Sequence, residues 1–189
     1  MQVIKNRKLN RLKEYDYARE GMYFVTICVK NREYFLGNII KGEMRLSKIG
    51  QIARKYWQEI PDHFPDAKLD EFIIMPNHIH GIIVIIGNKN LCSLQMSIWQ
   101  KQWARSVSSV VRGFKIGVTK WCRQNNCEYF IWQKSYYDHI IRNEKSLLKI
   151  REYIFNNPFK WEIDRNNLEN ELPHRKRMGF PVQLPRLVI

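Results

Sequence analysis

Two apolar runs that meet at a Pro-Asn pair constrain the fold of this chain more than any other feature. Residues 72–75 read FIIM, residues 79–86 read IHGIIVII, and Pro76-Asn77 between them favours a tight turn. Short runs rich in isoleucine and valine are typical of buried strands. The sequence therefore predicts two paired central strands between Leu69 and Ile86.

The flanking patterns place helices and further strands around this pair. Residues 22–30, and two short runs within residues 34–46, predict a strand and a hairpin, and residues 128–132 predict another short strand. Apolar residues at spacings of three and four predict helices after Ser47, over residues 107–121, and from the N-cap Asn143 to Pro158. This order predicts an α+β fold, with one antiparallel sheet and helices packed on one face.

Chain length and net charge indicate the number of domains and the kind of partner. At 189 residues the chain suits one compact domain, expected at residues 1–162, while the proline-interrupted residues 163–189 read as a tail that wraps or is partly disordered. A net charge of +14 predicts a polyanionic partner, nucleic acid before all others. No apolar run approaches the roughly 18 residues of a membrane span, so we expect a cytoplasmic, nucleoid-associated protein with no membrane partner.

His78 and His80 open the second of the two apolar strands. Alternate residues of a strand share a face, so both imidazoles project together, with their Cα atoms about 6 to 7 Å apart, while Ile79 points the other way. That geometry suits two ligands of one metal ion. A pair of hydrogen-bonded histidines at a strand end is the alternative that the spacing leaves open.

The helix predicted over residues 143–158 carries a polar ridge beside its buried stripe. The ridge consists of Ser146, Lys149, Tyr153 and Asn157. Tyr153 and Asn157 are neighbours at i and i+4, so a phenol and an amide can reach the same point. The alternative is a tyrosine at the rim of the core and an ordinary helix end before Pro158.

Basic residues beside aromatic ones predict a nucleic-acid surface. Cations would hold the phosphates, and tyrosine rings could stack on unpaired bases at about 1 to 3 kcal/mol each. A solvated basic surface is the competing explanation. The candidate DNA-binding residues are Arg105, Arg112, Lys115, Lys134, Tyr136, Tyr137, Arg142 and Lys149.

Two segments carry a resemblance to a known family: MPNHIHG at residues 75–81 and WQKSYYDHIIRNEKSLLKIREYIFNNPFKW at residues 132–161. They resemble the single-tyrosine HUH transposases, and more closely the REP-associated tyrosine transposases. A histidine-hydrophobe-histidine strand, an arginine-acidic helix start and a tyrosine four residues before an amide residue follow in the family's order. The resemblance covers roughly residues 5–162.

The resemblance implies a ferredoxin-like sheet with the histidines on a central strand. It implies that His78, His80 and Asn157 hold Mg²⁺ or Mn²⁺ and that Tyr153 is the nucleophile. The implied activity is metal-dependent nicking and strand transfer of single-stranded DNA at hairpin-forming repeats. It would proceed through a 5′-phosphotyrosine, without a nucleotide cofactor, in a monomer or a homodimer.

Departures from the family pattern leave alternatives open. Tyr136 and Tyr137 are rival nucleophiles, although they precede the helix on which the family places its tyrosine. Asn157 is one methylene shorter than the Gln that the family often carries. The second candidate function is therefore a catalytically silent protein, derived from a transposase, that binds hairpin or repeat DNA. A metal-dependent nuclease that uses water is the third.

Overall fold

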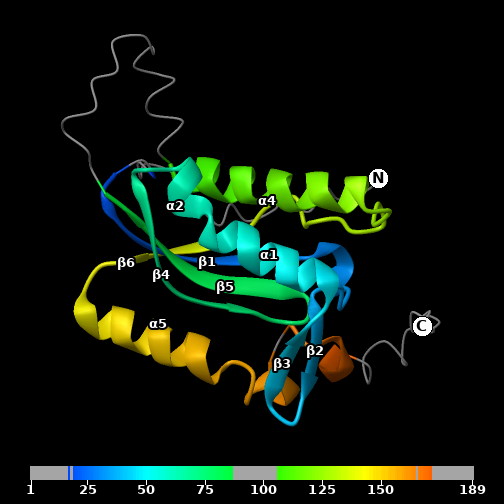
Figure 1. The fold of residues 1–189 in the computed structure, drawn as a ribbon. Helices are drawn as coiled ribbons and strands as arrows, with labels where there is room; N and C mark the ends of the chain where they lie inside the picture. The colour runs from blue at the N-terminus through cyan, green and yellow to red at the C-terminus, as the bar shows by residue number, and fades with distance from the viewer. Residues whose placement is uncertain (1–16, 18, 87–105, 165, 172–189) are drawn as a thin grey trace, which may run out of the picture.

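Four antiparallel strands form the main sheet of the computed structural model, which describes residues 17, 19–86, 106–164 and 166–171. The strands are β1 (Gly21–Cys28), β4 (Ala67–Ile74), β5 (His78–Ile85) and β6 (Tyr137–Ile141). Their order is β4-β5-β1-β6, so β5 and β1 are central (Figure 1). The two apolar runs do pair as predicted. However, β4 lies at the edge, because β1 occupies the other side of β5.

A small hairpin and the helices complete the fold. The hairpin strands are β2 (Gly37–Ile40) and β3 (Glu43–Leu46). Lys41 and Gly42 between them have φ of 52° and 77°, the left-handed conformation that tight two-residue hairpin turns require. The helices are η1 (Lys30–Arg32), α1 (Lys48–Gln58), α2 (Ile60–His63), α4 (Val107–Gln124), α5 (Glu144–Asn156), η2 (Trp161–Ile163) and η3 (Leu168–Glu171). Ser47 and Asn143 cap α1 and α5 as predicted.

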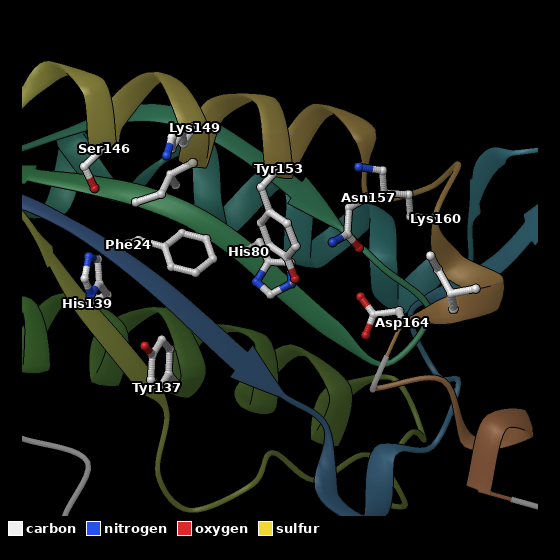
Figure 2. A pocket seen from close by; sticks show the side chains of 12 residues that line it. Phe24, His80, Tyr137, His139, Ser146, Lys149, Tyr153, Asn157, Lys160 and Asp164 are labelled. Carbon is white, nitrogen blue, oxygen red and sulfur yellow. The ribbon is translucent and has the colours of Figure 1, made fainter.

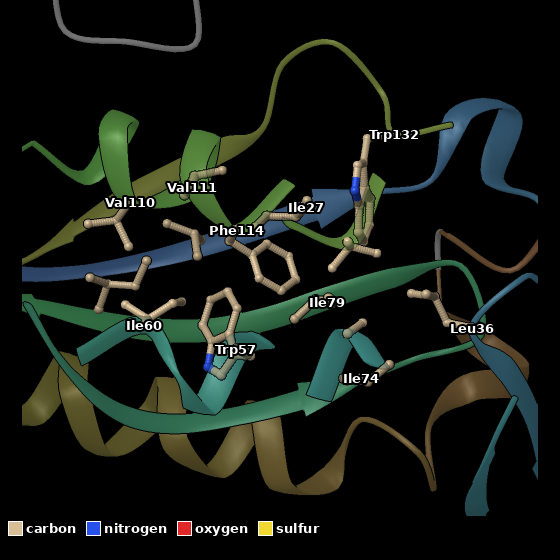
Figure 3. Close-up of a cluster of buried hydrophobic side chains, with 14 of the residues drawn as sticks. Ile27, Leu36, Trp57, Ile60, Ile74, Ile79, Val110, Val111, Phe114 and Trp132 are labelled. Atoms are coloured by element: carbon tan, nitrogen blue, oxygen red, sulfur yellow. The ribbon is translucent and has the colours of Figure 1, made fainter. Parts of the chain in front are cut away.

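Side chains of the sheet alternate between two cores, one on each face. The larger core joins the sheet to α1 and α4, and its centre is Trp57, whose ring meets Phe114 edge-on at 5.3 Å between centroids (Figure 3). The Trp57 ring also fills the space where a Cβ of Gly81 would lie. The smaller core joins the sheet to α5 and consists of Phe24, Ile82, Ile141, Leu147 and Ile154.

The helices therefore cover both faces of the sheet, α1 and α4 on one and α5 on the other (Figure 1). The predicted α+β class and antiparallel sheet are confirmed, and the prediction that helices pack on one face is wrong. The reason lies in β5, where seven of the eight residues are buried. A strand buried on both sides needs a layer of structure over each side.

The last strand lies later in the chain than predicted. Residues 128–132 form no strand and make one isolated bridge, between Trp132 and Val29. Phe130 and Trp132 are apolar because they pack into the larger core, not because they alternate along a pleat. The fourth strand of the sheet is β6, whose polar start (Tyr137 to His139) concealed it in the sequence.

Asn167 and Leu168 contact the body of the protein. The Tyr34 hydroxyl donates to Asn167 Oδ1 at 2.7 Å and accepts from the Leu168 amide at 2.9 Å. Most of the expected tail, residues 172–189, lies outside the described part of the chain. Within the described residues, no helix is long and apolar enough to cross a membrane.

Candidate active site

His78 and His80 lie side by side on the central strand β5, on the face that α5 covers. Both side chains are almost completely buried, with exposed fractions of 0% and 1%. Their Nε2 atoms are 3.0 Å apart. Two ligand atoms at about 2.1 Å from one ion, at about a right angle, have this separation. The strand geometry therefore brings two imidazole nitrogens to one point.

The other ring nitrogen of each histidine has a polar partner. Nδ1 of His78 is 2.8 Å from Asn77 Oδ1, and Nδ1 of His80 is 2.9 Å from Thr26 Oγ1. Thr26 reaches His80 because the two residues are directly opposite in the β1–β5 register. Partners of this kind orient histidines that bind metals, since they fix the ring and leave Nε2 for the ion.

Two side chains that carry oxygen atoms, Asn157 and Asp164, lie near His80 (Figure 2). His78, His80 and Asp164 each offer a ligand atom, and the three atoms lie within 4.8 Å of one another. Asn157 lines a cavity that also contains His80 and Tyr153. Its Oδ1 is buried with no hydrogen-bond partner in the described part of the chain. A buried oxygen without a partner costs about 1–3 kcal/mol, and a cation bound at Oδ1 would remove that cost. The residues present fit a divalent metal ion.

Tyr153 stands beside this group on α5. Its hydroxyl is 3.2 Å from Nε2 of His80, and its ring meets Phe24 edge-on at 6.0 Å between centroids. Tyr153 is 40% exposed and lines the cavity that also contains His80. Tyr153 thus combines contact with the histidines and access from solvent.

The two rival tyrosines lie elsewhere. Tyr136 points toward α4, where its hydroxyl is 3.2 Å from Ser108 Oγ. Tyr137 is opposite Thr26 on β1, and Thr26 is opposite His80 on β5. Two strand spacings, or about 10 Å, therefore separate the backbones of Tyr137 and His80. Tyr137 lines the cavity, but Tyr153 is the tyrosine beside the histidines.

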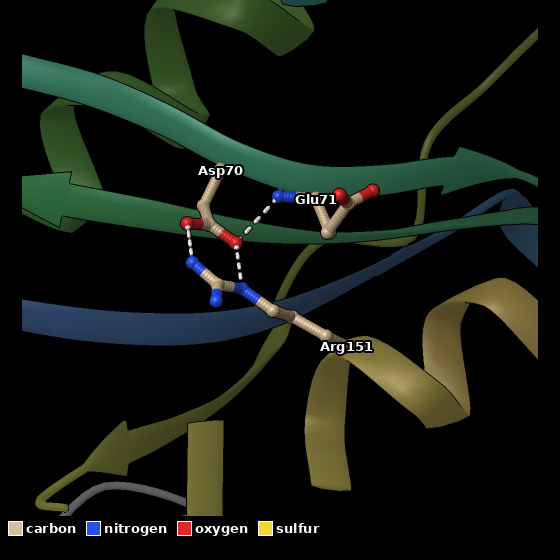
Figure 4. A network of polar contacts seen from close by, with 3 residues as sticks. All are labelled: Asp70, Glu71 and Arg151. Carbon is tan, nitrogen blue, oxygen red and sulfur yellow. Dashed lines mark hydrogen bonds and ion pairs between the residues drawn. The ribbon is translucent and has the colours of Figure 1, made fainter. Parts of the chain in front are cut away.

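Helix α5 is held on the sheet by an ion pair as well as by its apolar stripe. Arg151 donates to both carboxylate oxygens of Asp70 on β4, at 2.8 and 2.6 Å (Figure 4). These bonds hold the pKa of the Asp70 carboxyl below its ordinary value of 3.8, against the opposing effect of burial. The bidentate geometry fixes the helix that carries Tyr153 and Asn157 relative to the strands.

The cavity around Tyr153 has a volume of about 610 Å³ and runs along α5. All four residues of the predicted polar ridge line it, which confirms the ridge: Ser146, Lys149, Tyr153 and Asn157. Lys149 and Lys160 add positive charge, and Tyr137 and His139 face them from β6. A cavity lined by cations and rings suits a chain of phosphates and unpaired bases.

The remaining predicted DNA-binding residues do not gather at this cavity. Arg112 is exposed on α4, and Lys134 is exposed in the loop after it, both beyond the opposite face of the sheet. Lys115 donates to the carbonyls of Gln133 and Ser135, and burial lowers its pKa to about 8. Arg142 is exposed just before α5, and Arg105 lies outside the described residues.

Three residues of the site were missed by the sequence analysis. Thr26 could have been identified from the sequence, since its hydroxyl interrupts the apolar run YFVTICV. Asn77 was read as a turn residue, although it precedes His78 directly. Asp164 had no signal, because only the fold brings residues after α5 to the histidines.

A sheet with two histidines on a central strand, faced by a tyrosine on helix α5, is the arrangement that the sequence resemblance implied. No protein-family model matches the chain. An uncharacterized protein of Haemophilus influenzae is 48% identical over 168 residues, which are 86% of this chain and 93% of that protein. Another protein of that organism, named "Putative REP-associated tyrosine transposase", is 26% identical over 77% of this chain and 74% of its own length.

A solved structure shares the fold. It is that of a REP-associated tyrosine transposase bound to a REP hairpin, with a TM-score of 0.56 and 24% identity over 79% of this chain and 73% of that chain. The resemblance to the REP-associated tyrosine transposases is thus confirmed, and the chain is a relative of these proteins in sequence and in fold.

Proposed function

We propose that this protein nicks single-stranded DNA and transfers the cut strand, with Tyr153 as the nucleophile and a divalent metal ion held beside it. One observation carries the proposal: the Tyr153 hydroxyl lies 3.2 Å from Nε2 of His80, which is itself 3.0 Å from Nε2 of His78. The proposal is further supported by the 40% exposure of Tyr153, which lines the same cavity as His80.

The ligands would be Nε2 of His78 and of His80, a carboxylate oxygen of Asp164, and Oδ1 of Asn157. A mixed set of nitrogen and oxygen donors suits Mn²⁺ and also admits Mg²⁺. When bound, such an ion polarises a scissile phosphate and stabilises the charge that develops on it. Asp164 thus joins the set implied by the family resemblance.

The chain's own residues perform the transfer. Tyr153 Oη forms a bond to phosphorus, and the bond from phosphorus to the 3′-oxygen breaks. The phenol loses a proton and the new 3′-hydroxyl gains one, which leaves a 5′-phosphotyrosine. Lys149 and Lys160 would hold neighbouring phosphates in the cavity. Attack by another 3′-hydroxyl reverses the step, so strand transfer needs no nucleotide cofactor.

Hairpin-forming repeats are the proposed substrate, since the solved relative is bound to a REP hairpin. The test is to incubate the protein with single strands that carry hairpin repeats from around its own gene, plus Mn²⁺ or Mg²⁺. We expect a DNA-protein adduct that survives denaturing electrophoresis. Tyr153→Phe should abolish the adduct, whereas the matched variant Tyr137→Phe should retain it. Cleavage by Tyr153→Phe at an undiminished rate would refute the proposal.

A second candidate, a silent hairpin-binding protein, is favoured by the short side chain of Asn157, which is only 2% exposed. It predicts hairpin binding that survives His78→Ala and no adduct with either metal. A nuclease that uses water is recognised by a third result, cleavage that leaves no protein on the DNA.

A further inference from the structure

Asn77 lies between β4 and β5, directly before the first histidine of the site. It is completely buried, with an exposed fraction of 0%. Its side chain is 2.8 Å from Nδ1 of His78, so it touches a proposed ligand from the side away from His80. The oxygen and the nitrogen of a buried amide both need hydrogen-bond partners. The neighbouring donors and acceptors therefore determine which way the amide is oriented.

Both hydrogens of the Asn77 amide have acceptors. Nδ2 donates to the backbone carbonyl of Asn166 at 2.7 Å and to that of Arg32 at 3.0 Å. A carbonyl oxygen cannot donate, so the reverse orientation would set Oδ1 against two other oxygens. The amide nitrogen must therefore face the carbonyls, and Oδ1 must face the histidine.

This orientation determines which nitrogen of His78 carries the proton. Oδ1 has no hydrogen, so the bond of 2.8 Å forms only if Nδ1 of His78 donates. A neutral imidazole carries one N–H, and its other nitrogen keeps a lone pair. That other nitrogen is Nε2, which faces His80.

We propose that Asn77 is a positioning residue that holds His78 in the Nδ1–H form and thereby presents the Nε2 lone pair to a metal ion. The inference rests on the proposed function only for the use made of that ion. Two remote segments enforce it, because Arg32 and Asn166 supply the two carbonyls. Two residues after α5 thus contribute to the site. Asp164 lies in the ligand cluster, and the Asn166 carbonyl orients Asn77 behind His78.

The backbone at Arg32 supports this role. Arg32 has a φ of 56°, in the left-handed region that side chains other than Asn, Asp and Gly rarely adopt. Such conformations are strained and persist where surrounding contacts enforce them. The carbonyl of Arg32 is one of the two that orient Asn77.

The first experiment needs no metal and no DNA. The ¹⁵N shifts of the histidine rings in metal-free protein, at about pH 8 where free imidazole is neutral, report the tautomer directly. We expect His78 to carry its proton on Nδ1 in the wild type and to lose that preference in Asn77→Ala. A wild-type His78 protonated on Nε2 overturns the inference, even if no Asn77 variant folds.

The second experiment measures Mn²⁺ affinity by calorimetry. Asn77→Ala should bind about 10- to 100-fold more weakly, the usual effect of losing the partner of a ligating histidine. Asn77→Asp keeps an acceptor for Nδ1 but should recover little, because its second carboxylate oxygen would face the carbonyls of Asn166 and Arg32. Asn167→Ala is the matched control, because Asn167 is also buried but its amide donates to the Trp161 carbonyl.

An equal loss of Mn²⁺ affinity in Asn77→Ala and Asn167→Ala would show that Asn77 only holds the chain together, and would overturn the inference. The outcome is separable from the proposed function. A protein that shows the Nδ1–H tautomer and binds Mn²⁺ but never forms a DNA adduct refutes the proposed activity and leaves the role of Asn77 intact.

Discussion

The two faces of the sheet share the same strands but differ in chemistry. On β1, Tyr23, Val25 and Ile27 enter the core beneath α1 and α4. Phe24 and Thr26 alternate with them and face α5, where Thr26 contacts His80. One face is thus filled by apolar side chains, and the other combines a small core with polar groups and a cavity.

One face of the sheet supplies most of the stability, and the other carries the candidate reactive groups. Buried polar groups contribute little to folding even when they are bonded, so a domain with an active site needs apolar burial elsewhere. The larger core supplies it, with Trp57 and Phe114 at its centre. Helix α5 rests on a smaller core and is tied by Arg151 to Asp70. Substitutions on the face of α1 and α4 should therefore mainly lower stability. Substitutions on the face of α5 should mainly affect the candidate site.

The largest effect is expected for Trp57→Ala on the face of α1. Removal of a fully buried indole should lower the free energy of unfolding by about 3–5 kcal/mol, measured by urea denaturation. Tyr153→Phe, on the other face, removes one hydroxyl, which lies 3.2 Å from Nε2 of His80, and should cost about 1 kcal/mol or less. Comparable losses in the two variants would contradict the division between the faces.

Thr26→Val should weaken Mn²⁺ binding by about 10- to 100-fold, because Nδ1 of His80 loses its partner while the volume stays the same. Calorimetric titration measures the change. Thr119→Val is the matched control, since Thr119 bonds its hydroxyl to the Lys115 carbonyl on α4. An unchanged affinity in Thr26→Val, or an equal loss in the control, would count against a polar role specific to the face of α5.

Lys115 should make the face of α4 sensitive to alkaline pH. Its pKa falls from 10.5 to about 8 through burial, so between these values the unfolded chain binds more protons than the folded one. Stability from this group therefore rises as the pH increases from about 8 to about 10.5. The difference in unfolding free energy between wild type and Lys115→Met should change in that window. A difference that stays constant across this window would contradict the lowered pKa of Lys115.

The smallest effect is expected at the ion pair of α5 in acid. The pKa of Asp70 lies below its ordinary value of 3.8, chiefly through hydrogen bonds from Arg151, so the pair stabilises the fold above that pH. Its contribution should disappear as the pH falls through the lowered pKa. We expect the stability difference between wild type and Asp70→Asn to shrink below about pH 3.8. A constant difference would mean that Arg151 does not hold the carboxylate.

Local patterns predicted most of the elements. The start of α1 after Ser47, the cap Asn143, the helical spacing of α1, α4 and α5, and the hairpin within residues 34–46 depend on neighbours a few residues away. The pattern failed at residues 128–132, since aromatic residues that fill a core and those that line a strand look alike in sequence. It also failed to place helices on both faces, because packing partners are distant in the chain.

The sequence by itself determined which groups could react, and in part where they face. The two-residue period of a strand puts His78 and His80 on one side, and the helical period puts Tyr153 and Asn157 on one ridge. Only the tertiary structure decided that the ridge lies over the histidines, with the Tyr153 hydroxyl 3.2 Å from His80, and that Asp164 and Asn166 return to the same strand. Periodicity sets orientation within an element, whereas the distance between elements follows from how both faces of the sheet are covered.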